Sequence, residues 1–194
     1  MNVLVIFEDF RKDQSLKHSI DAIFAELDRP GKSKAKVQIC YDPLLQGISQ
    51  ALKWENMDWI VKHYPMVNIF LLCVDRDCQI GRRAELDHLE NKVKTETLLK
   101  PNQVFLGECA WQELEVWILA GHHDLPSHWE WKAIWQDCNP KETYYLPYAK
   151  QRNVAETLGN GRKILGQEAA KNYSRLRTLC PEDIGHLEQR LEEL

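Results

Sequence analysis

Three carboxylates follow apolar runs that are typical of buried strands. Glu8 comes directly after the run at residues 3–7, and Asp75 and Asp77 follow the most apolar run of the chain, residues 67–74. In an open parallel sheet the ligand site lies at the carboxyl ends of the strands, so we expect these side chains to converge. The i, i+2 spacing of the two aspartates places both carboxylates on one side of an extended chain, about 6.6 Å apart along the backbone. Oxygen ligands of this kind suit Mg²⁺, and two such ions about 4 Å apart can activate water and stabilise a leaving oxygen.

A carboxylate at the end of a strand is often no ligand, because it can cap the following helix or point into solvent. For any one of the three acids this interpretation is the more common one. The set is different, since three carboxylates gathered at the ends of two apolar strands would repel one another without a cation. The pattern therefore favours a site for Mg²⁺ or Mn²⁺ built from Glu8, Asp75 and Asp77.

Three other acids could belong to the same centre. Glu113 and Glu115 lie in a segment, residues 111–120, whose apolar pattern predicts an amphipathic helix. Residues two apart on a helix point about 200° away from each other, so only one of these glutamates is expected to face the metal. Glu108, at the end of the predicted fourth strand, is a further candidate ligand.

Arg162 and Lys163 open a predicted helix directly after the sequence Gly159-Asn160-Gly161. Free backbone N–H groups and a cationic side chain at such a position could contact a phosphate group. The glycine spacing does not match a Walker loop, which requires a G-x-x-x-x-G-K-[ST] pattern. A loop with ordinary surface basic residues is an equally good interpretation. If a phosphate binds, Lys163 is the residue that we expect to offset its charge.

The elements that position these residues alternate between strand and helix in the first part of the chain. Strands are predicted at residues 3–7, 36–40, 67–74 and 103–106. Helices are predicted at residues 13–28, after Asp42-Pro43 and at residues 82–99, with the inward positions of the second at Ile48, Leu52, Trp59 and Ile60. This order predicts an α/β fold with right-handed crossovers and a central parallel four-stranded sheet.

Only helices and loops are predicted beyond the fourth strand. The helices are expected at residues 111–120, 141–152, 162–173 and 181–193. A chain of 194 residues, 44% of them hydrophobic, can bury one sizeable core with a small appendage but hardly two full domains. We therefore expect residues 1–120 to form an α/β domain and residues 121–194 to form a helical C-terminal extension packed on the same core.

The net charge and the cysteine pattern narrow the class of protein. A net charge of −4 gives no global positive field, so a nucleic acid would have to be attracted by local basic residues and metal ions. Six cysteines without a CxxC pair, and a start without the basic flank of a secretory signal, predict reduced thiols and a cytoplasmic protein. No apolar stretch reaches the roughly 18–20 residues of a membrane helix, so no membrane partner is expected.

Two further groups of residues invite a functional interpretation. The cluster of His122, His123, Asp124 and His128 could suggest zinc, but its spacing matches no familiar zinc site and favours a turn with partly buried rings. Several tryptophans could stack on nucleic-acid bases, although packing of the C-terminal helices onto the sheet is the favoured interpretation. These tryptophans are Trp111, Trp117, Trp129, Trp131 and Trp135.

A Glu after the first strand and Asp-x-Asp after the third, in a β-α-β-α-β-α-β order, resembles the TOPRIM domain of topoisomerases, bacterial primases and OLD-family nucleases. More narrowly, the chain is similar to small stand-alone TOPRIM-like proteins of the DUF4276 and RloB type, several of which are associated with phage defence. The segment Glu-Leu-Glu-Val-Trp-Ile-Leu at residues 113–119 is similar to the family's Glu-x-Trp helix, and residues 161–181 are similar to its Lys-containing C-terminal helices. Many TOPRIM domains have Gly after the first Glu, where this chain has Asp9-Phe10.

The resemblance implies a Rossmann-like TOPRIM fold and a Mg²⁺- or Mn²⁺-dependent nuclease that hydrolyses phosphodiesters, of DNA rather than RNA, with an ABC- or AAA-type ATPase as a partner. It implies Glu8, Asp75, Asp77 and Glu115 as metal ligands, because Glu115 matches the Glu-x-Trp position, and Lys163 as the stabilising cation. The low basicity leaves a different class open: a non-catalytic metal- or nucleotide-binding subunit of an ATPase-associated complex. Primase-like nucleotidyl transfer is disfavoured, since no template-binding region is visible.

Overall fold

The computed structural model describes residues 1–8, 17–27, 34–157 and 159–194. One sheet of four parallel strands, in the order β2-β1-β3-β4, forms its centre. The strands are β1 (Asn2–Phe7), β2 (Lys36–Ile39), β3 (Ile69–Asp75) and β4 (Val104–Ala110). The predicted α/β fold with a central parallel four-stranded sheet is therefore confirmed, and it agrees with a Rossmann-like arrangement.

The apolar strands are buried on both faces of the sheet because helices cover both. Alternate residues of β1 enter different cores: Val5 and Phe7 pack on one face, and Leu4 and Ile6 pack on the other. All four side chains are 0–1% exposed. An uninterrupted apolar run, rather than an alternating one, is what a doubly covered parallel strand requires.

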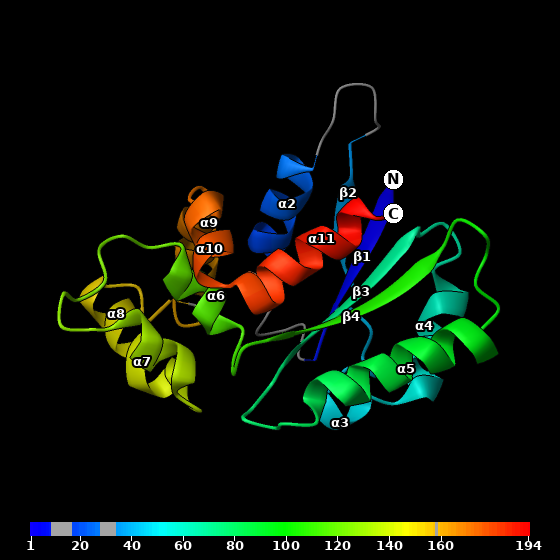
Figure 1. Cartoon of the computed structure of the whole chain (residues 1–194), viewed down its shortest axis with the longest axis horizontal. Helices are drawn as coiled ribbons and strands as arrows, with labels where there is room; N and C mark the ends of the chain where they lie inside the picture. The colour runs from blue at the N-terminus through cyan, green and yellow to red at the C-terminus, as the bar shows by residue number, and fades with distance from the viewer. Residues whose placement is uncertain (9–16, 28–33, 158) are drawn as a thin grey trace.

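The helices form two layers around the sheet, as Figure 1 shows. One layer consists of α3 (Ile48–Ala51), α4 (Trp54–His63) and α5 (Arg82–Glu96). The core on the opposite face is shared by α2 (Lys17–Glu26) and the C-terminal elements: α6 (Glu115–Ala120), α7 (Trp131–Gln136), η2 (Lys141–Tyr145), α8 (Leu146–Gln151), α9 (Arg162–Ala170), α10 (Tyr173–Leu179), η3 (Pro181–Gly185) and α11 (His186–Glu192). Among the described residues, no helix combines the length and the apolar character needed to cross a membrane.

Several predicted boundaries differ from the observed ones. The single helix expected after Asp42-Pro43 is split into α3 and α4, and Trp59 is 39% exposed on α4, where it stacks on His63, rather than facing inward. Residues 171–172 separate α9 from α10, so the helix expected over residues 162–173 is two helices. The helix predicted at residues 13–28 overlaps α2, but its residues 13–16 and 28 lie outside the described part, as do Asp9 and Phe10.

The boundary whose change affects the acidic residues most is the start of α6. The predicted helix at residues 111–120 begins only at Glu115. Before it, Gln112 adopts a left-handed conformation with φ 71°, and the backbone N–H groups of Trp111 and Leu114 are bound by aspartates of other segments, Asp183 and Asp75. Residues 111–114 therefore form a loop that joins the end of β4 to the end of β3.

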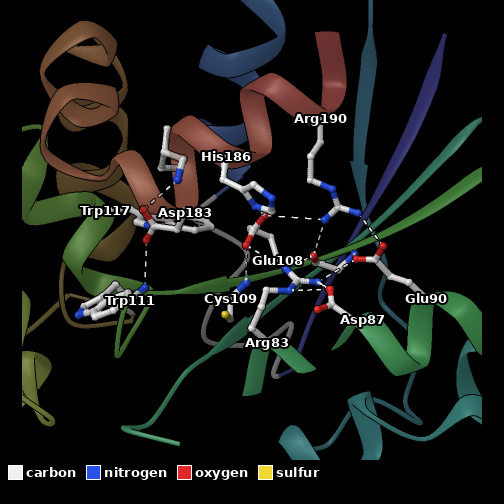
Figure 2. A network of polar contacts seen from close by, with 12 residues as sticks. Arg83, Asp87, Glu90, Glu108, Cys109, Trp111, Trp117, Asp183, His186 and Arg190 are labelled. Atoms are coloured by element: carbon white, nitrogen blue, oxygen red, sulfur yellow. Dashed lines mark hydrogen bonds and ion pairs between the residues drawn. The ribbon is translucent and has the colours of Figure 1, made fainter. Parts of the chain in front are cut away.

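A polar network closes the outer edge of β4, as shown in Figure 2. The backbone of Gly107 donates its N–H to Glu90 Oε1 at 2.7 Å, and its carbonyl accepts hydrogen bonds from Arg83 at 2.8 Å and Arg190 at 2.9 Å. Side chains of α5 and α11 thus satisfy the backbone groups that an edge strand would otherwise present to another strand.

Helix α9 packs very closely against the end of α6. A Cβ atom at Gly121, directly after α6, would lie 2.4 Å from the Cα atom of Ala169 in α9. Only a residue without a side chain allows these two backbones to pack so closely. This contact holds α9 against the end of α6, the helix that leads into the part of the chain beyond residue 120.

Candidate functional site

Three carboxylates gather at the carboxyl ends of β3 and β4. Oxygen atoms of Asp75, Asp77 and Glu113 all lie within 4.8 Å of one another. Among the described residues, this is the one group of three or more His, Cys, Asp or Glu side chains with a spacing that could hold a metal ion. Carboxylate oxygens are hard ligands, and a set of three with solvent access is suited to Mg²⁺ or Mn²⁺.

The two loops that carry these acids are joined to each other. The Asp77 N–H donates to the Gln112 carbonyl at 2.9 Å, and the Cys78 N–H donates to the Gln112 side-chain oxygen at 2.8 Å. On the other side, Asp75 Oδ1 accepts a hydrogen bond from the Leu114 N–H at 2.7 Å. Gln112, which is 6% exposed, therefore fixes the distance between the aspartates and Glu113.

Glu113 joins the aspartates because it lies in the loop before α6. Its carboxylate also accepts a hydrogen bond from the Lys141 N–H at 2.8 Å, at the start of η2. Burial raises the pKa of Glu113 to about 7, and the nearby Glu115 and Glu142 carboxylates add to the rise while the contact with Lys141 opposes it. A carboxylate that is this costly to ionise would be stabilised by a cation.

Glu8 lies beside the same group, at the end of β1. Phe7 is paired in register with Cys73, so the residue after β1 reaches the end of β3. Burial and the charge of Asp77 raise the pKa of Glu8 to about 7, whereas a backbone hydrogen bond from Asp75 and the charge of Arg82 act in the opposite direction. Glu8 Oε2 is buried and has no hydrogen-bond partner among the described residues.

Arg82 is the cation whose charge lowers the pKa of Glu8. It opens α5, is only 7% exposed, and donates to Glu85 at 2.6 Å through Nη1. Its Nε–H is buried without a partner among the described residues. No signal in the sequence marked this residue, because an arginine at the start of a charged helix is ordinary.

Glu115 lies close to the acidic group but is already paired. Its carboxylate is bound by both the Nε and Nη2 groups of Arg162, with a distance of 2.8 Å from Nε, and both residues are less than 5% exposed. The loop that brings Arg162 there has three successive left-handed residues, Gly159, Asn160 and Gly161. A Cβ atom at Gly161 would lie 2.5 Å from Val154, so the loop requires glycine at that position.

The remaining two predicted candidates are placed elsewhere. Lys163 is exposed on α9, where its charge acts on His18 of α2. Glu108 is buried within β4, which continues to Ala110, so it does not lie at the strand end. Figure 2 shows Glu108 between Arg83 and His186, which contact its two oxygens at 3.2 Å and 2.8 Å.

His122 and the tryptophans pack within the protein, whereas the other two histidines of the cluster do not. His122 is buried, and its Nε2 lies 3.1 Å from the Leu165 carbonyl, whereas His123 and His128 are exposed. The tryptophans contact other parts of the C-terminal region, as the packing interpretation predicts. Trp117 donates to Asp183, Trp131 donates to the Leu179 carbonyl, Trp111 stacks on Trp135, and Trp129 packs against Tyr144.

The cysteines correct the prediction of six reduced thiols. Cys78 and Cys138, which are 60 residues apart in sequence, form a disulfide. The other four are free: Cys40, Cys73 and Cys180 are buried, and Cys109 is partly exposed. The disulfide depends on two loops meeting beside the acidic group, so the spacing of cysteines in the sequence could not reveal it.

Comparison of the chain with protein-family models, with curated proteins and with solved structures found no match.

Proposed function

We propose that this protein hydrolyses phosphodiester bonds of nucleic acids in a reaction that depends on Mg²⁺ or Mn²⁺. The observation that carries the proposal is the convergence of Asp75, Asp77 and Glu113 within 4.8 Å, with a buried oxygen of Glu8 beside them that has no hydrogen-bond partner in the described part of the chain. The unpartnered oxygen matters, because a buried polar atom without a hydrogen bond is costly unless a ligand satisfies it. Acids collected at the carboxyl ends of parallel strands are also where this type of fold binds its ligands.

The residues present suit a hard divalent cation. Asp75, Asp77, Glu113 and Glu8 would hold it, and they offer only oxygen atoms. When bound, the ion would supply polarisation of the phosphate and activation of the attacking water. Arg82, whose charge already acts on Glu8, would offset the charge that develops on the phosphate.

The sequence interpretation is modified in two positions. Glu113 takes the ligand role expected of Glu115, because Arg162 already binds the Glu115 carboxylate, while the charge of Glu115 still raises the pKa values of Glu8 and Glu113. Arg82 takes the role expected of Lys163, because the charge of Arg82 acts on Glu8, whereas that of Lys163 acts on His18. The TOPRIM family assignment, a DNA substrate, an ATPase partner and a place in phage defence stay part of the proposal as the resemblance implies them.

A second candidate function is a subunit that binds a metal ion or a nucleotide without catalysis. The observation in its favour is the commitment of Arg162 to Glu115 inside the protein, which removes one buried cation from contact with a substrate. Metal binding without any turnover would select this function.

The test is cleavage of supercoiled plasmid, linear duplex, single-stranded DNA and RNA with Mg²⁺ or Mn²⁺, with and without any ATPase encoded beside it. We expect Asp75→Asn to abolish cleavage and metal binding together. Asp87→Asn, which replaces an exposed acid of α5 that pairs with Arg83 and does not belong to the acidic group, is the matched control and should behave as the wild type. If the wild type cuts none of the substrates, or if Asp75→Asn cuts as fast as the wild type, the proposed hydrolysis is refuted.

A further inference from the structure

The Cys78–Cys138 disulfide connects the two halves of the acidic group. Cys78 directly follows Asp77, and Cys138 precedes by three residues Lys141, whose N–H binds the Glu113 carboxylate. One covalent bond thus spans from the loop that carries the exposed aspartate to the segment that holds the glutamate. Because Asp77 and Glu113 come from different loops, their separation depends on how these two segments are held together.

The loop at Asp77 needs such restraint. Both Asp77 and Cys78 have φ 53°, in the left-handed region that residues other than glycine seldom adopt. Conformations of this kind persist where the surroundings over-determine them. The two hydrogen bonds to Gln112 and the contact of Arg76 with the Trp111 ring tie this loop to the segment before α6, and the disulfide ties it to the segment before η2.

The sulfur atoms of the disulfide are accessible to a reductant in solution. Cys138 is exposed and Cys78 is partly exposed, whereas Cys40, Cys73 and Cys180 are buried. Burial also raises the pKa of Cys109, the one partly exposed free thiol, to about 11, which makes it a poor nucleophile at neutral pH. Exposed disulfides are the ones that act as labile or regulatory bonds.

We infer that Cys78 and Cys138 form a reversible redox site that sets the affinity of the acidic group for a divalent cation. A thiolate of an external dithiol attacks the exposed Cys138 sulfur, which forms a mixed disulfide and releases Cys78 as a thiolate. The second thiol of the reductant then attacks the mixed disulfide and releases Cys138. The protein disulfide gains two electrons and two protons, and the dithiol is oxidised to a disulfide.

Reduction removes the covalent link between the Asp77 loop and the segment that ends at Lys141, so that non-covalent contacts alone hold the ligands and their arrangement loosens. Loss of the groups that orient metal ligands typically lowers metal affinity by about 10–100-fold. The oxidised protein is therefore the form that binds the cation well. This inference rests on the proposed function for its ligand, which is a divalent cation. The loosening of the loop on reduction does not depend on the proposed function.

The experiment measures binding of Mn²⁺ to the oxidised full-length protein and to protein reduced with a dithiol and desalted under inert gas. Electron paramagnetic resonance of free Mn²⁺ gives the affinity. We expect the reduced protein to bind at least about tenfold more weakly. Cys138→Ser should bind like the reduced protein whether or not reductant is present, and Cys109→Ser, the matched control, should keep the full redox response.

Amide hydrogen exchange of Asp77, Cys78 and Lys141, measured without metal, separates the two proposals. Faster exchange at these amides on reduction supports the redox site even if no metal binds in either state, an outcome that would refute the proposed function alone. If both redox states bind Mn²⁺ with the same measurable affinity, the inference is overturned. So does unchanged exchange at the three amides, or a redox response that persists in Cys138→Ser.

Discussion

The metal-free protein should become less stable as Glu8 ionises, and replacement of Glu8 by Gln should remove this loss. Glu8 has an ordinary pKa of 4.5 and a folded-state pKa of about 7, raised first by burial and then by the Asp77 charge. A carboxyl group whose pKa is higher in the folded state binds more protons there than in the unfolded chain. Its contribution to stability is complete below pH 4.5 and is lost as the pH rises through 7.

The size of the effect follows from the two pKa values. At 1.36 kcal/mol per pKa unit, a rise from 4.5 to about 7 corresponds to about 3 kcal/mol of unfolding free energy lost between pH 4.5 and pH 8. The neutral Gln side chain of Glu8→Gln cannot ionise, so the variant keeps this free energy. Relative to the wild type, the variant should gain about 2–3 kcal/mol from pH 5 to pH 8, or roughly 4–12 °C in melting temperature for a chain of this length.

The assay is urea unfolding at pH 5, 6, 7 and 8 in the presence of a chelator, followed by tryptophan fluorescence. Titrating groups that do not interact with Glu8 are the same in the two proteins, so they cancel in the difference. Glu55→Gln, at an exposed position of α4, is the matched control and should follow the wild-type profile. A difference between Glu8→Gln and wild type that stays constant from pH 5 to pH 8 would refute the reasoning.

The same reasoning predicts that a divalent cation stabilises the folded wild-type protein at pH 8. A ligand that binds only the folded state stabilises it by about 2.7 kcal/mol at a concentration of 100 Kd. Saturating Mn²⁺ at pH 8 should therefore restore most of the stability that ionisation of Glu8 removes from the wild type. Glu8→Gln should gain clearly less from the ion, because it lacks one charged ligand, and an equal gain in both proteins would exclude Glu8 from the metal site.

Three further predictions test residues around the site and the core. Arg82→Gln should lower turnover by about 10²–10³, the usual cost of losing one electrostatic stabiliser, with metal affinity little changed. Lys163→Gln should leave kcat within about twofold, and a larger loss of kcat in Lys163→Gln than in Arg82→Gln, measured by steady-state kinetics, would reverse this assignment. Asp183→Ala leaves the N–H donors of Trp111, Trp117 and Ile184 without this acceptor and should cost about 2–5 kcal/mol in urea unfolding, a prediction that fails if the loss is below about 1 kcal/mol. Gly121→Ala forces apart two backbones and should cost about 1–3 kcal/mol, whereas Gly185→Ala, with its nearest neighbour atom 3.8 Å away, should cost less.

The sheet and the acids at its carboxyl edge could be predicted because both depend on local pattern. The uninterrupted apolar runs at β1 and β3 require strands covered on both faces, and strands of that kind are parallel and joined by helices. In a parallel sheet every carboxyl end lies on one edge, so Glu8 and Asp75 had to lie on the same side of the protein whatever the strand order. The strand order adds that β1 and β3 are direct neighbours.

The tertiary structure decided which side chains complete the acidic group, because residues in loops take their direction from distant contacts. Glu113 would point away from the site on a continuous helix, but hydrogen bonds from Leu114 to Asp75 and from Asp77 to Gln112 hold it in a loop instead. The same holds for Arg162, which only the fold brings to Glu115 across 47 positions of sequence. The disulfide between Cys78 and Cys138 likewise exists only because two loops meet, and no spacing along the chain encodes such a meeting.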